Sequence, residues 1–420
     1  MLYVLKNAWA LLLGMCLLMI GNGLQGTLLG VRGGIEGFST FEMSLVMSAY
    51  FLGFLGGSRF APEMIRRVGH VRVFAALASF ISAVLIIYPT LANPWVWVAG
   101  RVLIGFCFSG VYVTAESWLN NASTNETRGQ SLSLYMIVQT IGIITAQGLM
   151  LVADPGGFVL FVIPSVLVSI SFAPILLSIA PTPAFDRTKP LSLRQLYKIS
   201  PLGVTGMFLL GSVFSAQFGM SAVFGQQAGL TLPQISIFVS FFYIGALIVQ
   251  YPLGWLSDRM DRRRLIMIVA VLGGTGALVG FVMGQTYYAL LMAAFAIGGS
   301  SNPLYSLLIA YTNDFLDSED MAAASGGLMF INGLGAVSGP IITGWLMGVI
   351  GPYGYFLILL VLMYALGAYA LYRMTQRPAP RVDSTSAYAP VMPTSSPVAL
   401  ETAQEYAIDS AEAEESGKSS

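Results

Sequence analysis

The sequence predicts an all-α membrane protein with twelve transmembrane helices in two pseudo-symmetric six-helix bundles. Three observations support this prediction: an apolar composition, twelve apolar runs, and a weak repeat between the two halves of the chain. The 420 residues are 56% hydrophobic and 10% charged, with mean hydropathy +0.75. Soluble proteins carry about 25% charged residues. The composition therefore indicates a protein of the lipid bilayer, and nothing in it suggests binding to nucleic acid.

Twelve apolar runs in the sequence are long enough to be transmembrane helices. A hydrocarbon core about 30 Å thick needs about 20 apolar residues for each helical crossing. Helices are expected because lipid cannot satisfy backbone N–H and C=O groups, and the runs lack the alternation of barrel strands. The runs span residues 8–30, 41–58, 73–92, 94–116, 130–152, 157–180, 201–223, 234–256, 265–284, 287–311, 322–348 and 353–374.

Basic residues mark one side of the predicted bundle as cytoplasmic. Lysines and arginines near helix ends stay on the cytoplasmic side, and one set of loops carries most of them. That set comprises Lys6, Arg59, Arg66, Arg67, Arg72, Arg128, Arg187, Lys189, Arg194, Lys198, Arg259, Arg262, Arg263, Arg264, Arg373, Arg377, Arg381 and Lys418. The opposite loops carry Arg32. We therefore expect an integral protein of the cell (inner or plasma) membrane with both termini cytoplasmic.

The chain divides into two halves that repeat weakly. The polar stretch 181–200 separates six apolar runs from six others. This predicts a bundle over 1–180, a cytoplasmic linker over 181–200 and a second bundle over 201–375. At an offset of 193 residues the matched pairs are Gly105 and Gly298, Tyr112 and Tyr305, Asn120 and Asn313, Met136 and Met329, Gln139 and Asn332, and Gly142 and Gly335. Two six-helix halves repeated in parallel are a layout of secondary transporters.

The stretch GWLSDRMDRRR, residues 254–264, places six charged residues between two apolar runs. It resembles the loop motif G-x-x-x-D-R-x-G-R-R of the major facilitator superfamily. The matching positions are Gly254, Asp258, Arg259, Arg262 and Arg263, and Asp261 stands where the family prefers glycine. The resemblance covers about residues 5–375, and RRVGH at 66–70 is similar to a branch of poorly characterised bacterial members.

Charged residues near the cytoplasmic helix ends form a candidate gate. The resemblance implies that Asp258, Arg259, Arg262 and Arg263 latch the cytoplasmic side when the outside is open. Asp258 lies at a helix–loop boundary, where it can face the N-terminus of a neighbouring helix. An anion in that position is stabilised by about 0.3–1 kcal/mol. The alternative is that the arginines only set the membrane orientation. In the first half Ala61 stands where Asp258 stands in the second, so the second half should carry most of the latch.

Glu116 is the candidate gate acid of the first half. With Tyr112 and Arg128-Gly129, it resembles a tyrosine, glutamate and arginine-glycine pattern of sugar-porter relatives. Because Glu116 lies near the inner end of its run, its expected partners are Arg128, Arg66 or Arg67. We interpret it as part of a gate ion pair rather than as a proton carrier.

Polar residues inside the predicted helices are candidates for binding solute or protons. Arg101 is the clearest, because a charge deep in a membrane helix costs about 2.5–3.5 kcal/mol on insertion scales. The run RVLIGFCFSG resembles the family motif R-x-x-x-G-x-x-x-G/A, whose arginine is linked to proton coupling. Tyr112 falls on the same helical face as Arg101. The alternative is that the Arg101 side chain snorkels to the membrane surface. Other candidates, which could instead join helices, are Asn22, Gln25, Gln139, Gln147, Gln217, Asn302, Tyr305 and Asn332.

These features predict a secondary active transporter that moves a small solute by alternating access, with proton coupling as one option. One alternative is a gradient-independent facilitator (uniporter) of the same fold. Another is a drug/proton efflux antiporter, because the stretch 332–344 resembles the glycine–proline signature of antiporters, although that signature belongs on the fifth helix. The expected partners are a small-molecule solute, the lipid bilayer and protons, and we expect a monomer.

The sequence does not predict an enzyme, a cofactor or a metal site. No nucleophile–base pair or metal-ligand pattern is visible at membrane depth. The single histidine, His70, and the cysteines Cys16 and Cys107 lack metal-ligand spacing. Residues 376–420 are rich in proline, serine, threonine and, toward the end, acids. Such a segment lacks the apolar content to fold alone, so we expect a disordered cytoplasmic tail.

Overall fold

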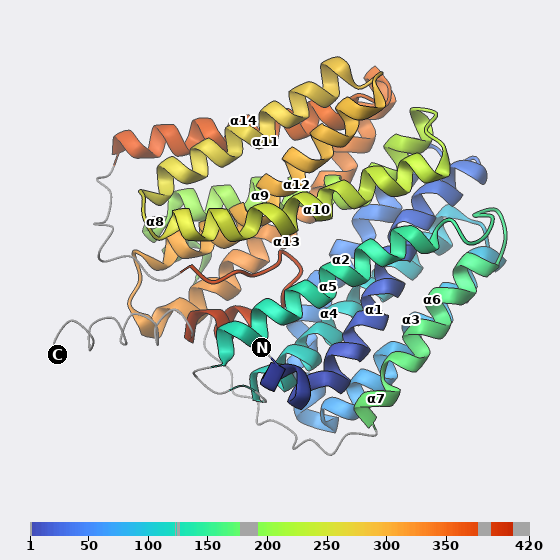
Figure 1. Ribbon diagram of the computed structural model, residues 1–420, viewed down its shortest axis with the longest axis horizontal. Helices are drawn as coiled ribbons and strands as arrows, with labels where there is room; N and C mark the ends of the chain where they lie inside the picture. The colour runs from blue at the N-terminus through green and yellow to red at the C-terminus, as the bar shows by residue number, and fades with distance from the viewer. Residues whose placement is uncertain (1, 122, 124–126, 177–191, 377–387, 406–420) are drawn as a thin grey trace.

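The computed structural model describes residues 2–121, 123, 127–176, 192–376 and 388–405, which form helices without strands. Two groups of helices lie side by side in Figure 1. The first group comprises α1 (Leu2–Ile35), α2 (Thr40–Val68), α3 (His70–Thr90), α4 (Pro94–Asn121), α5 (Arg128–Leu149), α6 (Val159–Ser171) and α7 (Ala173–Leu176). The second comprises α8 (Leu193–Ile199), α9 (Pro201–Gln227), α10 (Leu232–Ser257), α11 (Arg262–Met283), α12 (Tyr287–Asn313), α13 (Ser318–Ile350) and α14 (Gly354–Gln376). The protein is thus all-α and built of two helical bundles.

The helices begin and end at residues suited to capping. Ser39 caps α2 through a reciprocal pair of bonds with Glu42, in which each backbone N–H is accepted by the other side chain. Asp261 caps α11 by accepting the Arg263 N–H at 3.0 Å. Gly69 separates α2 from α3 at φ +86°, a conformation that side chains rarely adopt.

Each predicted apolar run coincides with helix over most of its described residues. The described part of the run 157–180 is divided between α6 and α7, and the other eleven each fall on one helix of 21 to 34 residues. Within the part of the chain that the structure describes, nine helices are long and apolar enough to cross a membrane. The membrane fold is therefore confirmed, while the count of twelve crossings stays a prediction. Most of the linker lies outside the described residues, but its end forms α8.

Glycines matched by the sequence repeat pack the same way in both halves. A β-carbon on Gly105 of α4 would lie 1.9 Å from the Tyr50 carbonyl oxygen of α2. A β-carbon on Gly298 of α12 would lie 2.0 Å from the Phe242 carbonyl oxygen of α10. Small residues let membrane helices approach to backbone contact. The crossing of α4 over α2 is therefore repeated by the crossing of α12 over α10.

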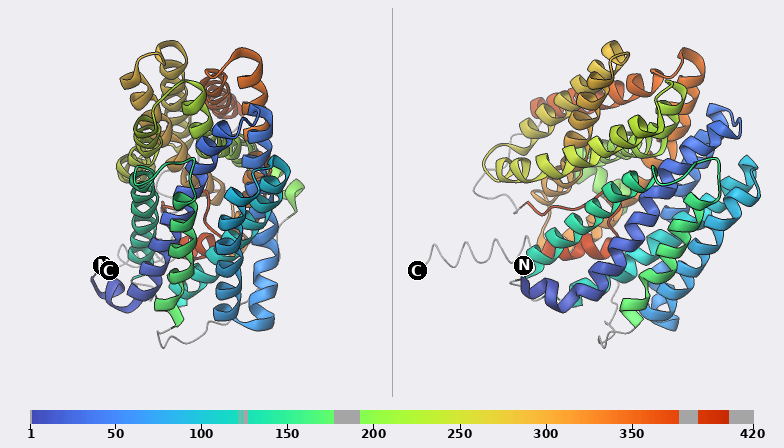
Figure 2. Two further views of the ribbon diagram at one scale, coloured as in Figure 1. Left: turned by 90° about the vertical axis from the view of Figure 1, so that its right-hand side faces the viewer. Right: turned by 45° about the vertical axis from the view of Figure 1, so that its right-hand side comes forward.

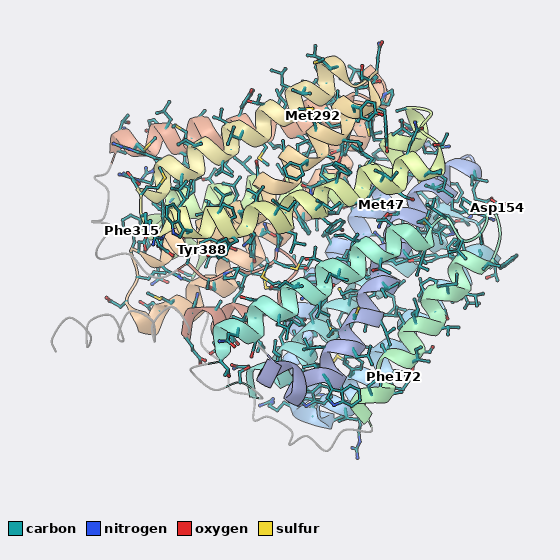
Figure 3. All side chains as sticks on the ribbon, in the orientation of Figure 1. Met47, Asp154, Phe172, Met292, Phe315 and Tyr388 are labelled. Atoms are coloured by element: carbon teal, nitrogen blue, oxygen red, sulfur yellow. The ribbon has the colours of Figure 1, made fainter. Side chains whose placement is uncertain are left out.

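The bundles touch each other directly at one end. We call the ends next to the loops 258–261 and 314–317 the basic side, and the ends next to 36–39, 150–158 and 351–353 the far side. Figure 3 shows Phe315 on the basic side and Asp154 on the far side. Near the far side, a β-carbon on Gly30 of α1 would lie 2.7 Å from the Ala222 β-carbon of α9. Gln227 of α9 also donates to the hydroxyl of Thr40 on α2.

A segment from the end of the chain lies between the bundles toward the basic side. Residues 388–405, which we call the tail segment, are drawn in red in Figure 1, and Figure 2 keeps them between the bundles in two further views. The segment is extended at first and helical over 397–405. Most of its side chains are buried. The disorder expected for 376–420 is therefore wrong for 388–405, while 377–387 and 406–420 lie outside the described residues.

Candidate functional site

Three cavities that share lining residues lie between the bundles, and together we call them the central cavity. The largest, of about 440 Å³, has Thr140 of α5, Gln250 of α10 and Asn302 of α12 in its walls. The second, of about 80 Å³, has Asn22 of α1 and Arg101 of α4. The third is about 20 Å³ and is walled by α2, α9 and α13. Both bundles thus contribute to one internal space, which the tail segment also lines.

A hydrogen-bonded chain of four predicted residues lines the second cavity. Arg101 Nη1 donates to Gln25 Oε1 at 2.8 Å, and Gln25 Nε2 donates to Asn22 Oδ1 at 3.0 Å. Asn22 Nδ2 in turn donates to the hydroxyl of Tyr112 at 3.2 Å. The i, i+3 spacing of Asn22 and Gln25 puts both amides on one face of α1. The structure therefore brings together four residues that the sequence singles out on two helices.

Arg101 is a buried cation whose described partners are neutral. It is 4% exposed, and its guanidinium carbon lies 4.8 Å from the centre of the Tyr50 ring. Its Nη2 donates to Met47 Sδ at 3.5 Å, and its Nε has no hydrogen-bond partner among the described residues. An aromatic face stabilises a cation by about 0.5–2 kcal/mol. That is less than the stabilisation that a buried carboxylate partner provides. Because the side chain is buried between helices, it does not snorkel to the surface.

Several of the other predicted amides join helices. Gln147 Oε1 on α5 accepts from the Thr27 hydroxyl on α1 at 3.0 Å. Gln217 on α9 accepts from Ser301 on α12 at 2.8 Å. Asn332 on α13 donates to the Met207 carbonyl oxygen on α9 at 3.1 Å. These bonds fit the alternative of polar helix–helix contacts, although Asn332 also lines the third cavity.

The remaining polar candidates are buried without a comparable link. Asn302 bonds within its own helix, to the Gly298 carbonyl oxygen at 3.5 Å, and lines the largest cavity. Tyr305 is fully buried, and its hydroxyl has no partner among the described residues. Gln139 is buried in α5. The structure therefore places Asn302 on the cavity wall and leaves the roles of Tyr305 and Gln139 as predictions.

The predicted gate residues of the second half form an ion-pair cluster on the basic side. Arg262 Nη1 lies 2.5 Å from Asp314 Oδ1, and these side chains are 1% and 2% exposed. Arg262 Nη1 also donates to the Ala310 carbonyl oxygen at 3.2 Å, and its Nη2 lies 3.5 Å from Asp258 Oδ1. Arg262 thus fastens the loop between α10 and α11 to the end of α12. The latch contacts described for Asp258 and Arg262 stay within the second bundle, apart from a bond to the tail segment.

The other two arginines of the motif also make local contacts. Arg263 Nη2 lies 3.0 Å from Asp261 Oδ2. The Asp261 carboxylate therefore both caps α11 and pairs with a motif arginine, although the family prefers glycine at that position. Arg259 is exposed, and its guanidinium carbon lies 4.2 Å from the centre of the Trp255 ring.

The expected pairing of Glu116 with Arg66 or Arg67 is wrong. Arg66 and Arg67 pair with Glu63 on their own helix at 2.7 Å and 2.8 Å and are largely exposed. Glu116 is buried, and its Oε1 accepts from the Tyr135 hydroxyl at 3.2 Å. The side chain of Arg128, the third expected partner, lies outside the described residues.

The acid Glu116 instead contacts the tail segment. Glu116 Oε2 accepts the backbone N–H of Ser396 at 2.8 Å. Asp258 Oδ1 similarly accepts the backbone N–H of Tyr388 at 3.0 Å. Figure 3 labels Tyr388 toward the basic side, near Phe315. Each predicted gate acid thus accepts a hydrogen bond from the backbone of the tail segment.

Sequence reasoning missed Tyr50, Ser306 and Asp314. Tyr50 falls opposite Tyr243 at the repeat offset of 193, and both line the second cavity. That match was available in the sequence. Asp314 lies in the acidic stretch that opens the loop before α13, but nothing local identifies it as the partner of Arg262. Ser306 carries no signal, because serine is common in these helices.

Sequence comparisons match nearly the whole chain to one family model, described as the Major Facilitator Superfamily, over residues 11–232 and 204–403. Among curated relatives, an "Uncharacterized MFS-type transporter YcaD" of Salmonella arizonae is 24% identical over 341 residues. That match covers 80% of this chain and 88% of the relative. A protein of the same description from Escherichia fergusonii is 25% identical over 344 residues, with the same coverage.

Solved structures of transporters share the fold. A mutant of nucleoside transporter NupG superposes with TM-score 0.74 at 15% identity, covering 87% of this chain and 99% of that chain. A mutant of the Escherichia coli fucose:proton symporter FucP superposes with TM-score 0.57 at 15% identity, covering 88% and 99%. At 15% identity these superpositions show a shared fold only. Membership of the family rests on the family model, which spans most of the sequence. The chain is therefore a transporter-type integral membrane protein that belongs to the Major Facilitator Superfamily.

Proposed function

We propose that the protein is a secondary active transporter that moves a small solute through the central cavity by alternating access, with proton coupling. One observation carries the proposal: the chain from Arg101 through Gln25 and Asn22 to Tyr112 lines a cavity walled by both bundles. Buried polar groups in membrane helices are costly and mark solute or ion pathways. The direct contacts near the far side and the cavity toward the basic side match one end state of a rocking cycle.

The chemistry of this chain favours a small polar solute. Arg101 presents a positive charge with neutral partners, and the amides of Asn22 and Gln25 can donate and accept hydrogen bonds. Aromatic rings of Tyr50 and Phe214 complete the wall. Such a wall suits a solute with both a ring-like apolar face and several hydroxyl or carbonyl groups.

The proposal is tested by uptake into proteoliposomes. The first solutes are nucleosides and fucose, because the structural neighbours are named for transporting them. Uptake of a recognised solute should rise when a pH gradient is imposed across the membrane. Uptake that is insensitive to the gradient in every arm contradicts proton coupling and leaves the uniporter.

A matched pair of arginine substitutions links uptake to the cavity. Arg101→Gln removes the charge-assisted bond to Gln25, and such bonds contribute about 1.5–3 kcal/mol, so uptake should fall at least about tenfold. Arg72→Gln is the control, because Arg72 lies exposed on α3 and makes no contribution to the cavity walls. Equal uptake by both variants contradicts the assignment of the site.

The antiporter alternative rests on the glycine–proline stretch of α13. There a β-carbon on Gly335 would lie 2.0 Å from the Phe208 carbonyl oxygen, and one on Gly339 would lie 2.4 Å from the Ser212 carbonyl oxygen. These contacts fit α13 closely against α9, so helix packing accounts for the glycines. Efflux of a lipophilic cation driven by an inward proton gradient would favour the antiporter instead.

A further inference from the structure

We propose that the central cavity is a binding site for the chain's own tail segment, residues 388–405, which plugs it from the basic side. Both bundles build the site, and in this structure it holds the main chain of the tail segment. Docking of the segment rests on its contacts with the two bundles. Its inhibitory effect on transport rests on the proposed function.

The segment is anchored at its start by Tyr388. The backbone N–H of Tyr388 donates to Asp258, and the Tyr388 hydroxyl accepts from Gln250 Nε2 at 2.7 Å. The ring lies against Gly254, where a β-carbon would sit 2.8 Å from the tyrosine Cδ1. A side chain at 254 would therefore displace the ring. Two residues of the charged family motif, Gly254 and Asp258, thus form the seat for this aromatic anchor.

The extended part of the segment is held by one hydroxyl of α12, that of Ser306. Ser306 Oγ accepts the Val391 N–H at 3.0 Å and donates to the Val391 carbonyl oxygen at 3.1 Å. Both backbone groups of this residue are thereby satisfied by α12. Beyond it, Thr394 lines the second cavity with Arg101 and the third with Asn332. The segment therefore reaches the polar residues proposed to bind solute.

The segment then turns and ends in a helix against both bundles. Ser396 N–H donates to Glu116 of the first bundle, and the Ser396 hydroxyl accepts the Val398 N–H at 3.2 Å, as a helix cap does. A carboxylate at a helix N-terminus is favoured by the helix dipole. At the other end, Gln404 donates to the hydroxyl of Ser325 on α13 in the second bundle. The tail helix thus joins α4 to α13.

These contacts explain how a segment too polar to fold alone becomes ordered. The cavity walls supply both the hydrogen-bond partners and the apolar surface, which bury Val391, Val398 and Leu400. A docked main chain also separates the bundles on the basic side, where a rocking cycle requires them to meet. The plug therefore blocks the solute path and holds the cavity in this state.

Accessibility of an introduced thiol in the full chain tests the docking. Leu55 lines the third cavity together with Pro393 and Thr394. A Leu55→Cys reporter in detergent-purified protein is labelled with a water-soluble maleimide, and the rate of the parent chain with Cys16 and Cys107 is subtracted. Ser306→Ala combined with Val391→Pro removes the bonds between α12 and the segment. Labelling should become about tenfold faster, as expected for the loss of two hydrogen bonds.

Ser300→Ala is the matched control for this experiment. Ser300 lies on the same helix, and its hydroxyl bonds within α12, to the Ala296 carbonyl oxygen at 2.7 Å. The reporter chain that also carries Ser300→Ala should be labelled at the same rate as the reporter chain alone. Equal rates in all chains, or an equal increase in Ser300→Ala, overturn the proposal. If the combined variant fails to fold, Ser396→Pro, which removes the N–H donated to Glu116, decides in the same way.

An uptake arm separates the two proposals. The labelling experiment needs no transported solute, so it tests docking even if the proposed function fails. Where a solute is transported, the combined variant should raise its initial uptake rate severalfold over Ser300→Ala. Faster labelling without faster uptake, in a protein that transports, overturns the inhibitory role.

Discussion

The basic sides of the two halves are built from different interactions. In the second half a buried ion pair, Arg262 with Asp314, ties the loop after α10 to the end of α12. In the first half the arginines Arg66 and Arg67 lie on the surface and pair with Glu63 on the same helix. Ala61, the counterpart of Asp258, is buried among apolar side chains. Among the described residues, the helix crossings thus repeat in both halves, whereas the buried ion pair of the second half stands against surface pairs in the first.

The largest effect should come from breaking the buried pair. Arg262→Ala leaves Asp314 buried without this cation, and such a loss costs about 3–5 kcal/mol. The thermal unfolding temperature in detergent should drop sharply in Arg262→Ala. Arg262→Lys keeps a positive charge and should lower the unfolding temperature less. An unfolding temperature equal to that of the parent protein would mean that the two halves are fastened alike.

Substitution of the repeated glycines should affect the two halves equally. Gly105→Ala and Gly298→Ala each force a β-carbon against a carbonyl oxygen of the facing helix. Overpacking of this kind costs about 1–3 kcal/mol. Gly148→Ala is the control, since nothing lies within 4 Å of its β-carbon position. Strongly unequal losses of stability for the first two substitutions would show that the packing repeat is only apparent.

A smaller effect is expected from the exposed acid of the motif. Asp258→Asn should weaken the outward-open state, because the latch predicted for this cluster loses its charge. Partly exposed pairs contribute about 0–1 kcal/mol, so the expected shift in population is up to about fivefold. Spin-label distances between the bundles measure it, with Glu63→Gln as the first-half control. Unchanged populations in Asp258→Asn speak against the latch.

The smallest effect should come from the surface pairs of the first half. Arg66→Ala and Arg67→Ala remove exposed i, i+3 and i, i+4 contacts. Each should change stability by less than about 0.5 kcal/mol. Thermal unfolding of the double variant checks this. A loss approaching that of Arg262→Ala would remove the contrast between the halves.

Local pattern predicted the helices and part of the polar network. Hydropathy alone identified the apolar runs, because lipid demands an apolar surface from every crossing. Helical spacing brought Asn22 and Gln25 together on α1 and put Arg101 on the face of α4 that carries Tyr112. These relations need only the 3.6-residue period. The link from Arg101 to Gln25 crosses between helices, and the sequence did not predict it.

Long-range partners were beyond sequence reasoning. Ser396 bonds to Glu116 although 280 residues separate them along the chain, and no charge or motif in the tail announces this contact. Composition suggested disorder for the tail, because such rules ask whether a segment can bury its own apolar groups. Composition rules do not consider whether the rest of the protein supplies a cavity in which the segment can be buried. The partners of Arg66 and Arg67 were missed for the opposite reason, since the nearest acid, Glu63, lies on the same helix.

The position of the tail segment after α14 has a consequence for biosynthesis. Residues 388–405 follow α14, so the helices of both bundles are synthesised before the segment that lies between them. At about 5–20 residues per second, synthesis of the segment adds only seconds to that of the bundles. Under the proposed plugging, the cavity of a newly made molecule therefore stays open until residues 388–405 have been synthesised.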